Sequence, residues 1–223
     1  SMEDDMKKLV GLIIAAAAAA MLFSLAACSE QTFTEGSYTL SGTEVKSITV
    51  DAEDRAVEVV ASTDGNVNVE YYASDKEYYD ISADGGHLTV SLVLDKSWTD
   101  YVGAQPDISY RTIRMEVPEV ALESLKISTT NEKIELSQIS ATDVSLVNNW
   151  GDITFGKMSV GNGAEFVTKN GNISGILAGE LNDYSVTCTV KKGSTNLPEN
   201  KDGGEKTLAV DCNNGDVNIE FSA

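Results

Sequence analysis

The sequence predicts an all-β protein, a right-handed parallel β-solenoid-like stack of rungs about 20 residues long. One phrase recurs five times in the second half of the chain: alternating apolar residues, a turn that usually contains Gly and in two cases Asn-Gly, and usually Ile or Val two residues after the turn position. The equivalent turn positions, Glu132, Gly151, Gly171, Gly193 and Gly215, follow one another after 19, 20, 22 and 22 residues, a period typical of stacked β rungs. After residue 36 no long stretch has the apolar spacing of an amphipathic helix. The five phrases are LKISTTNEKIEL (125–136), VSLVNNWGDITF (144–155), AEFVTKNGNISG (164–175), VTCTVKKGSTNL (186–197) and LAVDCNNGDVNI (208–219).

The first residues of the chain resemble the signal of bacterial lipoproteins. Lys7 and Lys8 provide a positive start, residues 9–25 are almost wholly apolar, and Leu25-Ala26-Ala27-Cys28 matches the lipobox, at which Cys28 is lipidated and becomes the mature N-terminus. We therefore expect residues 1–27 to be a lipoprotein signal peptide. An uncleaved membrane anchor or a core helix is the alternative, but charge, apolar run and cleavage site occur in the order expected of a signal. Lipid on Cys28 would hold the protein outside the cytoplasm, at the bacterial cell membrane.

The rest of the chain is predicted to be a short tether and one folded domain. Residues 28–36 are polar and are expected to link the lipid to the fold. Residues 37–223 suffice for a single β-repeat domain, with an irregular part, 37–118, and a regular part, 119–223. The net charge is −19, and residues 1–27 contribute only two lysines and three acidic residues to it. An acidic surface of this kind excludes nucleic acid as a partner, because phosphates require clusters of Lys and Arg.

In the irregular part, short runs of alternating or β-branched residues predict strands, and turns such as Asp64-Gly65 separate them. The longest irregular stretch is a loop, residues 95–107. Because a terminal unit must close a stack as well as continue it, we expect this part to cap one end. The predicted strands cover residues 47–50, 56–61, 66–72, 79–82, 87–94 and 110–117.

Aligned on the turn position, the five phrases place mostly apolar residues at one parity and mostly polar residues at the other. Since side chains alternate along a strand, one face of each rung should point into a common core, and consecutive stacked rungs should continue the apolar columns. Asn-Gly between alternating apolar residues also predicts hairpins, so an antiparallel β-sandwich of hairpins is the rival arrangement. We favour the solenoid because Met158 and Leu177 recur at equivalent places in the linking segments.

The sequence also resembles the bacterial toast-rack β-repeat family of adhesin-like proteins, over roughly residues 45–221. This resemblance implies an envelope or secreted protein with an adhesin-like role, and the family has no defined catalytic residues that could be carried over. The Asn-Gly pair is incomplete at 130–133 and at 191–193, so less regular corners are expected there, and Trp150 separates Asn149 from Gly151 in the second phrase. The phrases that carry the resemblance are Ile-Arg-Met-Glu-Val-Pro (113–118), Leu-Lys-Ile-Ser (125–128) and the Asn-Gly units 170–173 and 214–217.

The sequence offers little material for catalysis or metal binding. His87 is the only histidine, which excludes sites with two imidazoles and leaves one candidate for a Ser-His-Asp relay. Because it follows a turn and has no nucleophile motif nearby, we interpret it as an ordinary turn residue. Acidic clusters invite a calcium site, but the glycine-aspartate nonapeptide of calcium-binding β-rolls is absent. We therefore predict no metal, no cofactor and no catalytic residues.

Cys188 and Cys212 lie five and three residues before the turn position in neighbouring rungs, so both should face the core. A disulfide between them is chemically permitted outside the cell. Their offset places the pair diagonally across the rungs, near or beyond the roughly 7 Å between Cα atoms that a disulfide can span. Both outcomes remain open, and buried free thiols are slightly favoured.

Aromatic residues are concentrated in the irregular part, and Trp98 and Tyr101 lie in its longest loop. Binding residues are often found on such loops, so these two side chains are candidates for contact with a glycan or a protein on the cell surface. The other interpretation, which we favour, is that the rings cover the open end of the solenoid, because exposed strand edges require protection.

These features predict a lipid-anchored envelope protein that acts by binding or structural presentation and is not an enzyme. The alternative from another class is a short β-helix enzyme that acts on polysaccharides, which should show a concave groove lined by two or more carboxylates. A third interpretation is a sensory or regulatory envelope lipoprotein whose partner is another membrane protein.

Overall fold

The computed structural model describes residues 31–223, and the predicted signal peptide and Cys28 lie outside this range. The described chain is all-β, with three short 3-10 helices and no α-helix in that range. The 3-10 helices are η1 (Trp98–Tyr101), η2 (Ile108–Arg111) and η3 (Leu181–Asp183). The strands are β1 (Thr34–Ser41), β2 (Ser47–Asp51), β3 (Ala56–Ala61), β4 (Asn66–Ala73), β5 (Glu77–Asp84), β6 (His87–Leu94), β7 (Thr112–Val117), β8 (Leu122–Ser128), β9 (Ile134–Leu136), β10 (Ile139–Trp150), β11 (Ile153–Asn170), β12 (Ile173–Ala178), β13 (Tyr184–Lys192), β14 (Asn200–Lys201), β15 (Lys206–Asn214) and β16 (Val217–Ser222).

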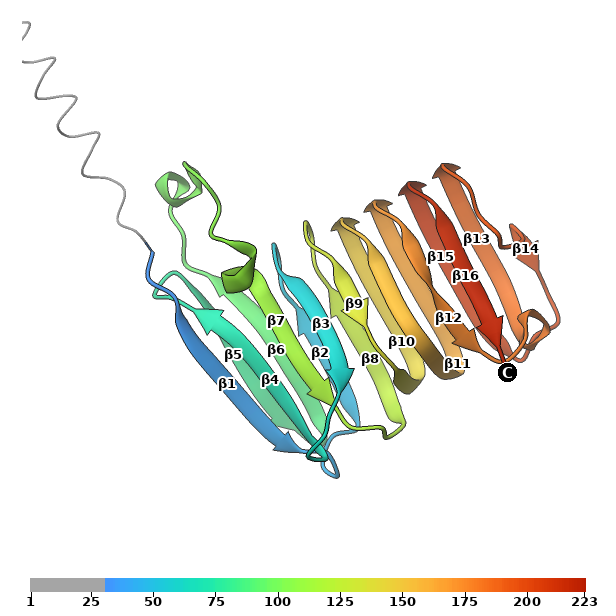
Figure 1. Ribbon diagram of the computed structural model, residues 1–223, viewed down its shortest axis with the longest axis horizontal. Helices are drawn as coiled ribbons and strands as arrows, with labels where there is room; N and C mark the ends of the chain where they lie inside the picture. Colours follow the sequence, from blue (N-terminus) through green and yellow to red (C-terminus); the bar gives the residue numbers. More distant parts are fainter. Residues whose placement is uncertain (1–30) are drawn as a thin grey trace, which may run out of the picture. The chain divides into compact units, whose positions relative to one another are not determined.

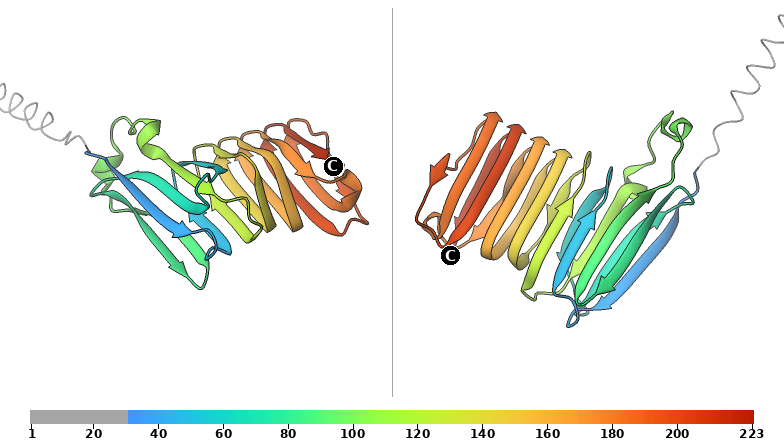
Figure 2. Two further views of the ribbon diagram at one scale, coloured as in Figure 1. Left: turned by 60° about the horizontal axis from the view of Figure 1, so that its bottom comes forward. Right: turned by 180° about the vertical axis from the view of Figure 1, so that it is seen from behind.

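Two layers of strands enclose one apolar core (Figure 1 and Figure 2). We call the layer with the order β5-β6-β2-β8-β10-β11-β15-β13-β14 sheet 1, and the layer with the order β1-β4-β7-β3-β9-β11-β12-β16 sheet 2. A complete rung places one strand in each sheet, with a tight corner between them. The long strand β11 belongs to both layers, because its first half pairs with β9 and β12 and its second half pairs with β10 and β15.

The regular repeats pair in parallel, so the solenoid prediction is confirmed and the sandwich of hairpins is not the arrangement. Ile127 on β8 pairs with Leu146 on β10, which pairs with Phe166 on β11, and all three side chains are buried. Met158 and Leu177 in the linking segments also pair with each other and are buried. Stacked apolar columns of this kind fill the core on both sides of each corner, and their burial is the main favourable contribution to folding.

The order of the rungs in space differs from their order in the sequence at both ends. Strands β6 and β7 form one rung, which we write β6–β7, and β2 and β3 form the rung β2–β3. The rung β2–β3 lies between β6–β7 and the strands β8 and β9, so β6–β7 is nearer the end of the stack although it comes later in the sequence. At the other end β15 lies between β11 and β13, so the phrase 186–197 is outermost although it is fourth in sequence. This phrase is incomplete, because only Thr195 bridges to β16 in sheet 2. A rung without a full second strand offers no surface on which another rung could pack, and it therefore ends the stack.

Antiparallel strands close the end formed by the irregular part, as expected of a cap. β1 pairs with β4, β4 with β7, and β5 with β6. β1 begins at Thr34, inside the segment 28–36 predicted as a tether, and pairs with the end of β4 there. At the opposite end the Asn196 side chain bonds both the N–H and the C=O of Ile219, at 3.0 and 2.8 Å, and so occupies part of the free edge of β16.

Glycines at the corners allow neighbouring rungs to approach closely. Gly151, Gly171 and Gly215 have φ angles of +149°, +155° and +150°, which residues with a Cβ rarely adopt. A Cβ on Gly171 would lie 2.1 Å from the carbonyl oxygen of Gly151, and one on Gly215 would lie 1.9 Å from that of Gly171. Each corner thus packs directly on the backbone of the next, which explains the recurring glycine of the sequence phrase.

Buried polar side chains beside the corners satisfy backbone carbonyls of the adjacent rung. Thr129 donates from its hydroxyl to the carbonyl of Arg55 at 2.6 Å, and Asn148 donates from Nδ2 to the carbonyl of Glu132 at 2.6 Å. Both side chains are at most 2% exposed. Because an unpaired buried carbonyl costs free energy, these inward polar residues contribute to the stacking of the rungs.

Candidate functional site

The most exposed apolar surface of the described chain belongs to the insertion between β6 and β7. We call residues 95–111 the aromatic loop; it takes the place of the corner in the rung β6–β7 and contains η1 and η2. Figure 1 shows it projecting beyond the corners of the other rungs. Trp98, Tyr101 and Val102 are 80%, 61% and 74% exposed. Side chains of this type normally lie inside a fold, so their exposure at one place marks a candidate contact surface.

The first turn of the aromatic loop is held by polar contacts. The backbone N–H of Asp95 donates to the carbonyl of Lys76 at 2.8 Å, and the Lys76 ammonium forms an ion pair with Asp100. The same carboxylate accepts from the backbone N–H and the hydroxyl of Ser97, at 2.8 and 2.9 Å, and caps η1. The hydrogen bonds from Lys76 and Ser97 lower the pKa of Asp100 to about 2, so this carboxylate is charged at neutral pH.

A buried group of charges lies directly beneath this turn. Glu77, at the start of β5, is 1% exposed and forms ion pairs with Arg55 and Lys96. Arg55 also donates from Nε to the hydroxyl of Tyr79 at 3.0 Å. Burial alone would raise the pKa of Glu77, but the hydrogen bonds from Lys96 and Arg55 outweigh it and leave this pKa below its ordinary value. The Lys96 ammonium also lies 5.3 Å from the centre of the Tyr101 ring, which links the exposed ring to the buried charges.

The second turn of the aromatic loop is fixed against the beginning of the described chain. The Tyr110 ring stacks on Phe33, with ring centres 5.1 Å apart, and meets the edge of Tyr72 at 5.4 Å. Arg111 donates to the carbonyl of Pro106 at 2.9 Å and pairs with Glu132. These contacts hold the base of the loop against Phe33, just before β1.

The two aromatic residues predicted as candidates do not cover the end of the stack. Trp98 and Tyr101 point away from the core, whereas Tyr71 and Tyr79 pack against it with ring centres 4.8 Å apart. The structure therefore leaves the two exposed rings available for contact. Their role in binding stays a prediction.

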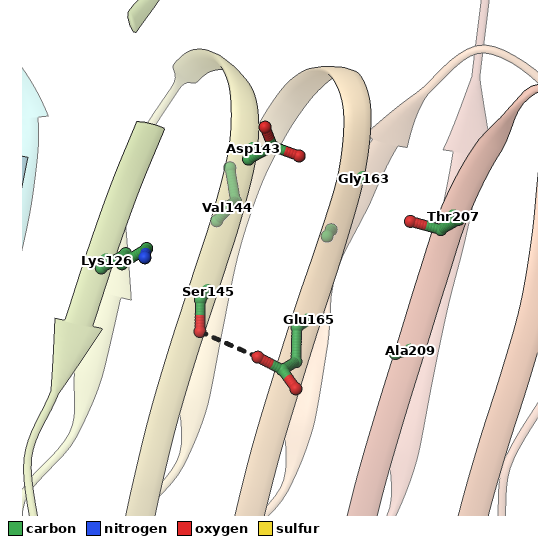
Figure 3. Close-up of a pocket in the computed structure, with 9 residues that line it drawn as sticks. Lys126, Asp143, Val144, Ser145, Gly163, Glu165, Thr207 and Ala209 are labelled. Atoms are coloured by element: carbon green, nitrogen blue, oxygen red, sulfur yellow. Dashed lines mark hydrogen bonds between the residues drawn. The ribbon is translucent and has the colours of Figure 1, made fainter. Parts of the chain in front are cut away.

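A second candidate is a shallow hollow of about 240 Å³ on the outer face of sheet 1 (Figure 3). Lys126, Ser145 and Glu165 lie side by side on β8, β10 and β11, and Asp143 and Thr207 complete the rim. The hydroxyl of Ser145 donates to Glu165 at 3.1 Å. Carboxylates, hydroxyls and an ammonium in one hollow are groups that hydrogen-bond to sugar hydroxyls or to polar protein groups.

Sequence reasoning missed this hollow, and it missed the buried charges below the aromatic loop. A signal for the hollow is present: small residues occupy outward positions in neighbouring rungs, such as Gly163 beside Thr207. A Cβ on Gly163 would lie 2.1 Å from the Thr207 hydroxyl, so only glycine leaves the surface open there. No comparable signal marks Glu77, whose partners are distant in the sequence.

The remaining predicted residues are placed as follows. Cys188 and Cys212 are buried and free, and the register pairs them with Val210 and Val190, which makes them diagonal neighbours. His87 is exposed at the start of β6 and contacts the Thr49 hydroxyl at 3.1 Å. Within residues 31–223, no group of three or more His, Cys, Asp or Glu side chains is arranged to hold a metal ion. No helix in this range is long and apolar enough to cross a membrane.

Comparison with known proteins bears on the fold. A solved structure from Clostridium sporogenes, named a "putative cell adhesion protein", is similar to this chain with a TM-score of 0.65 and 8% identity, over 86% of this chain and 100% of that one. A "putative adhesin" from Bacteroides fragilis has a TM-score of 0.37 and 12% identity, over 86% and 97% of the two chains. A "putative lipid binding protein" from Parabacteroides distasonis has a TM-score of 0.34 and 10% identity, over 85% and 97%. The TM-score of the first structure shows that it shares the fold of this chain, whereas the TM-scores of the other two are too low to show a shared fold.

A comparison with curated proteins gives no match. The family model described as Toastrack DUF4097 matches residues 45–222. The resemblance inferred from the strand and turn phrases is thereby confirmed, and the chain belongs to the Toastrack DUF4097 family.

Proposed function

We propose that the chain is a lipid-anchored surface protein of the bacterial cell envelope that acts as a non-catalytic, adhesin-like binding or structural module. The observation that carries this proposal is the hollow on sheet 1, where Lys126, Ser145 and Glu165 present polar groups from three neighbouring strands of the β stack. Rigid presentation limits the conformational entropy lost when a surface makes contact. The adhesion name of the neighbour with the same fold is consistent with this role. Cys28 would supply the anchor, and a glycan or a protein at the cell surface would be the partner.

The alternative as a polysaccharide-active enzyme has one feature in its favour, the two carboxylates Asp143 and Glu165 at the hollow. Both are exposed to solvent. Glycoside hydrolysis requires one carboxylic acid whose pKa is raised, and burial is the usual cause of such a shift. An open, shallow hollow does not supply that burial, so we favour binding over hydrolysis.

The test uses the purified full-length chain on a glycan array, together with a pull-down from detergent-solubilised membranes. We expect retention of a glycan or an envelope protein, loss of retention in Glu165→Lys, and normal retention in Glu220→Lys, which makes the same charge change at an exposed position on sheet 2. In parallel, cell-wall polysaccharides are incubated with the chain and their lengths are measured. If a polysaccharide is shortened by the original chain but not by Glu165→Lys, the chain is an enzyme and the proposal is contradicted.

A further inference from the structure

We propose that the tip of the aromatic loop, Trp98–Val102, contacts the surface of the lipid bilayer to which the chain is anchored. The rings of Trp98 and Tyr101 would lie among the lipid headgroups. This inference rests on the proposed lipid anchor at Cys28 and names the partner of the aromatic loop. The outer faces of the regular repeats would then remain free for the envelope partner.

The position of the loop carries the first step. Phe33 stacks on Tyr110 at the base of the loop, and it lies only five residues after Cys28. Five extended residues span at most about 18 Å, so a lipid on Cys28 keeps the base of the loop within that distance of the anchor point. Figure 1 and Figure 2 show the loop projecting from the same end of the stack at which β1 begins.

The chemistry of the tip carries the second step. Trp and Tyr are enriched where membranes meet water, because each ring has an apolar body and a polar group that can bond to headgroups or water. Val102 adds an apolar side chain that is 74% exposed. A turn that presents two such rings and a valine has the composition expected of a segment that enters a bilayer by roughly 5–10 Å.

The polar groups around the tip favour lipid over a glycan. Asp100 is committed to Lys76 and Ser97, and Lys96 is committed to Glu77. Sugar recognition needs polar groups beside the ring that can bond to hydroxyls, and these side chains already have partners inside the protein. A bilayer interface makes no such demand.

The charges also indicate which kind of lipid surface fits. The basic residues beneath the tip are neutralised by carboxylates, and the whole chain carries a net charge of −19. Attraction to anionic headgroups is therefore not the source of the contact. We expect the tip to enter zwitterionic phosphatidylcholine, and added salt should not release it, unlike a contact made by a basic patch.

The test uses the fact that the chain has two tryptophans. Trp150→Phe leaves Trp98 as the only indole, and Trp98→Phe leaves Trp150, which is 60% exposed at the end of β10 in the middle of the stack. The mature chain, purified from bacterial membranes, is placed in phosphatidylcholine vesicles whose acyl chains carry bromine near the headgroup. Flotation with the vesicles reports the anchor, and quenching of fluorescence by bromine reports the position of each indole.

We expect the vesicles to float the chain and to quench Trp98 strongly and Trp150 little. Val102→Asp should abolish the quenching of Trp98, while Val120→Asp, at another exposed valine, should not. Flotation without quenching of Trp98, or equal quenching of both indoles, would overturn the loop proposal and leave the anchor intact. Failure to float would overturn the anchor, and the inference with it. A glycan that protects Trp98 from a water-soluble quencher, with no quenching by lipid, would assign the loop to sugar binding and overturn the inference.

Discussion

Replacing a corner glycine tests how the rungs are held together. In Gly215→Ala, the new Cβ would lie 1.9 Å from the carbonyl oxygen of Gly171 and 2.6 Å from its carbon, both in the backbone of the adjacent rung. The residue would also keep a φ angle near +150°, in a region that favours glycine. Backbone cannot move aside as a flexible side chain can, so the rungs must separate locally or the corner must change its conformation.

The expected loss of stability has two parts. Alanine in this backbone region costs about 1–3 kcal/mol. Forcing an extra methyl group against packed backbone costs about 1–3 kcal/mol more. The sum, about 2–6 kcal/mol, is a large fraction of the roughly 5–15 kcal/mol by which single domains are stable. Gly203→Ala is the matched control: its φ angle is +98°, but no atom lies within 4 Å of the new Cβ, so only the backbone part remains.

Urea unfolding followed by circular dichroism measures both variants. We expect the midpoint of Gly215→Ala to fall well below that of Gly203→Ala, with unchanged dependence on urea, since the surface exposed on unfolding stays the same. The close packing of corners on one another would be refuted if the two variants lost the same free energy, or if Gly215→Ala lost less.

Three further predictions concern buried polar groups. Glu77→Gln should lower the free energy of unfolding by about 3–5 kcal/mol, because it leaves buried cations unpaired, whereas Glu116→Gln at a half-exposed pair should cost about 0–1 kcal/mol. Folding lowers the pKa of Glu77, so the contribution of this carboxylate to stability is complete above its ordinary pKa of 4.5 and is lost as the pH falls through the pKa of the folded state. The free energy of unfolding should therefore fall less steeply with acid in Glu77→Gln than in the original protein. An unchanged acid dependence would count against this pairing. Asn148→Ala should cost about 1–3 kcal/mol in urea unfolding, because the carbonyl of Glu132 loses its buried donor; no change would mean that water replaces the amide. Cys188 and Cys212 should react slowly with a thiol reagent in the native protein, because burial raises the pKa of both thiols. Both should react after unfolding without reductant, and no reaction then would establish a disulfide.

The repeats were predictable because nearly every rung has the same alternation of apolar and polar residues and a glycine at the turn. Alternation places Ile127, Leu146 and Phe166 on one face, and the turn glycine fixes their register, so the core follows from the pattern. The order of rungs at the ends was not predictable, because the phrases are nearly equivalent and any of them could pack on any other. The incomplete second half of the phrase 186–197 decides the order, and only the folded chain reveals it.

The sequence predicted where the aromatic loop lies, but not the contacts that hold it. A long irregular stretch with Trp98 and Tyr101 indicates an exposed loop, and the structure has one there. Its first turn is held by the pairs Lys76–Asp100 and Glu77–Lys96, which join residues about twenty positions apart and have no local signature. The sequence did not predict that β1 begins at Thr34, for a different reason. Pairing with an edge strand uses backbone groups, which polar side chains permit, so its sequence looks like a linker.

The mass of the N-terminal peptide, from protein extracted from cell membranes, shows whether a lipid on Cys28 anchors this β stack to the cell envelope. We expect a peptide that begins at Cys28 and carries acyl chains. A peptide with unmodified Cys28, or one that begins upstream with the apolar segment retained, would contradict it.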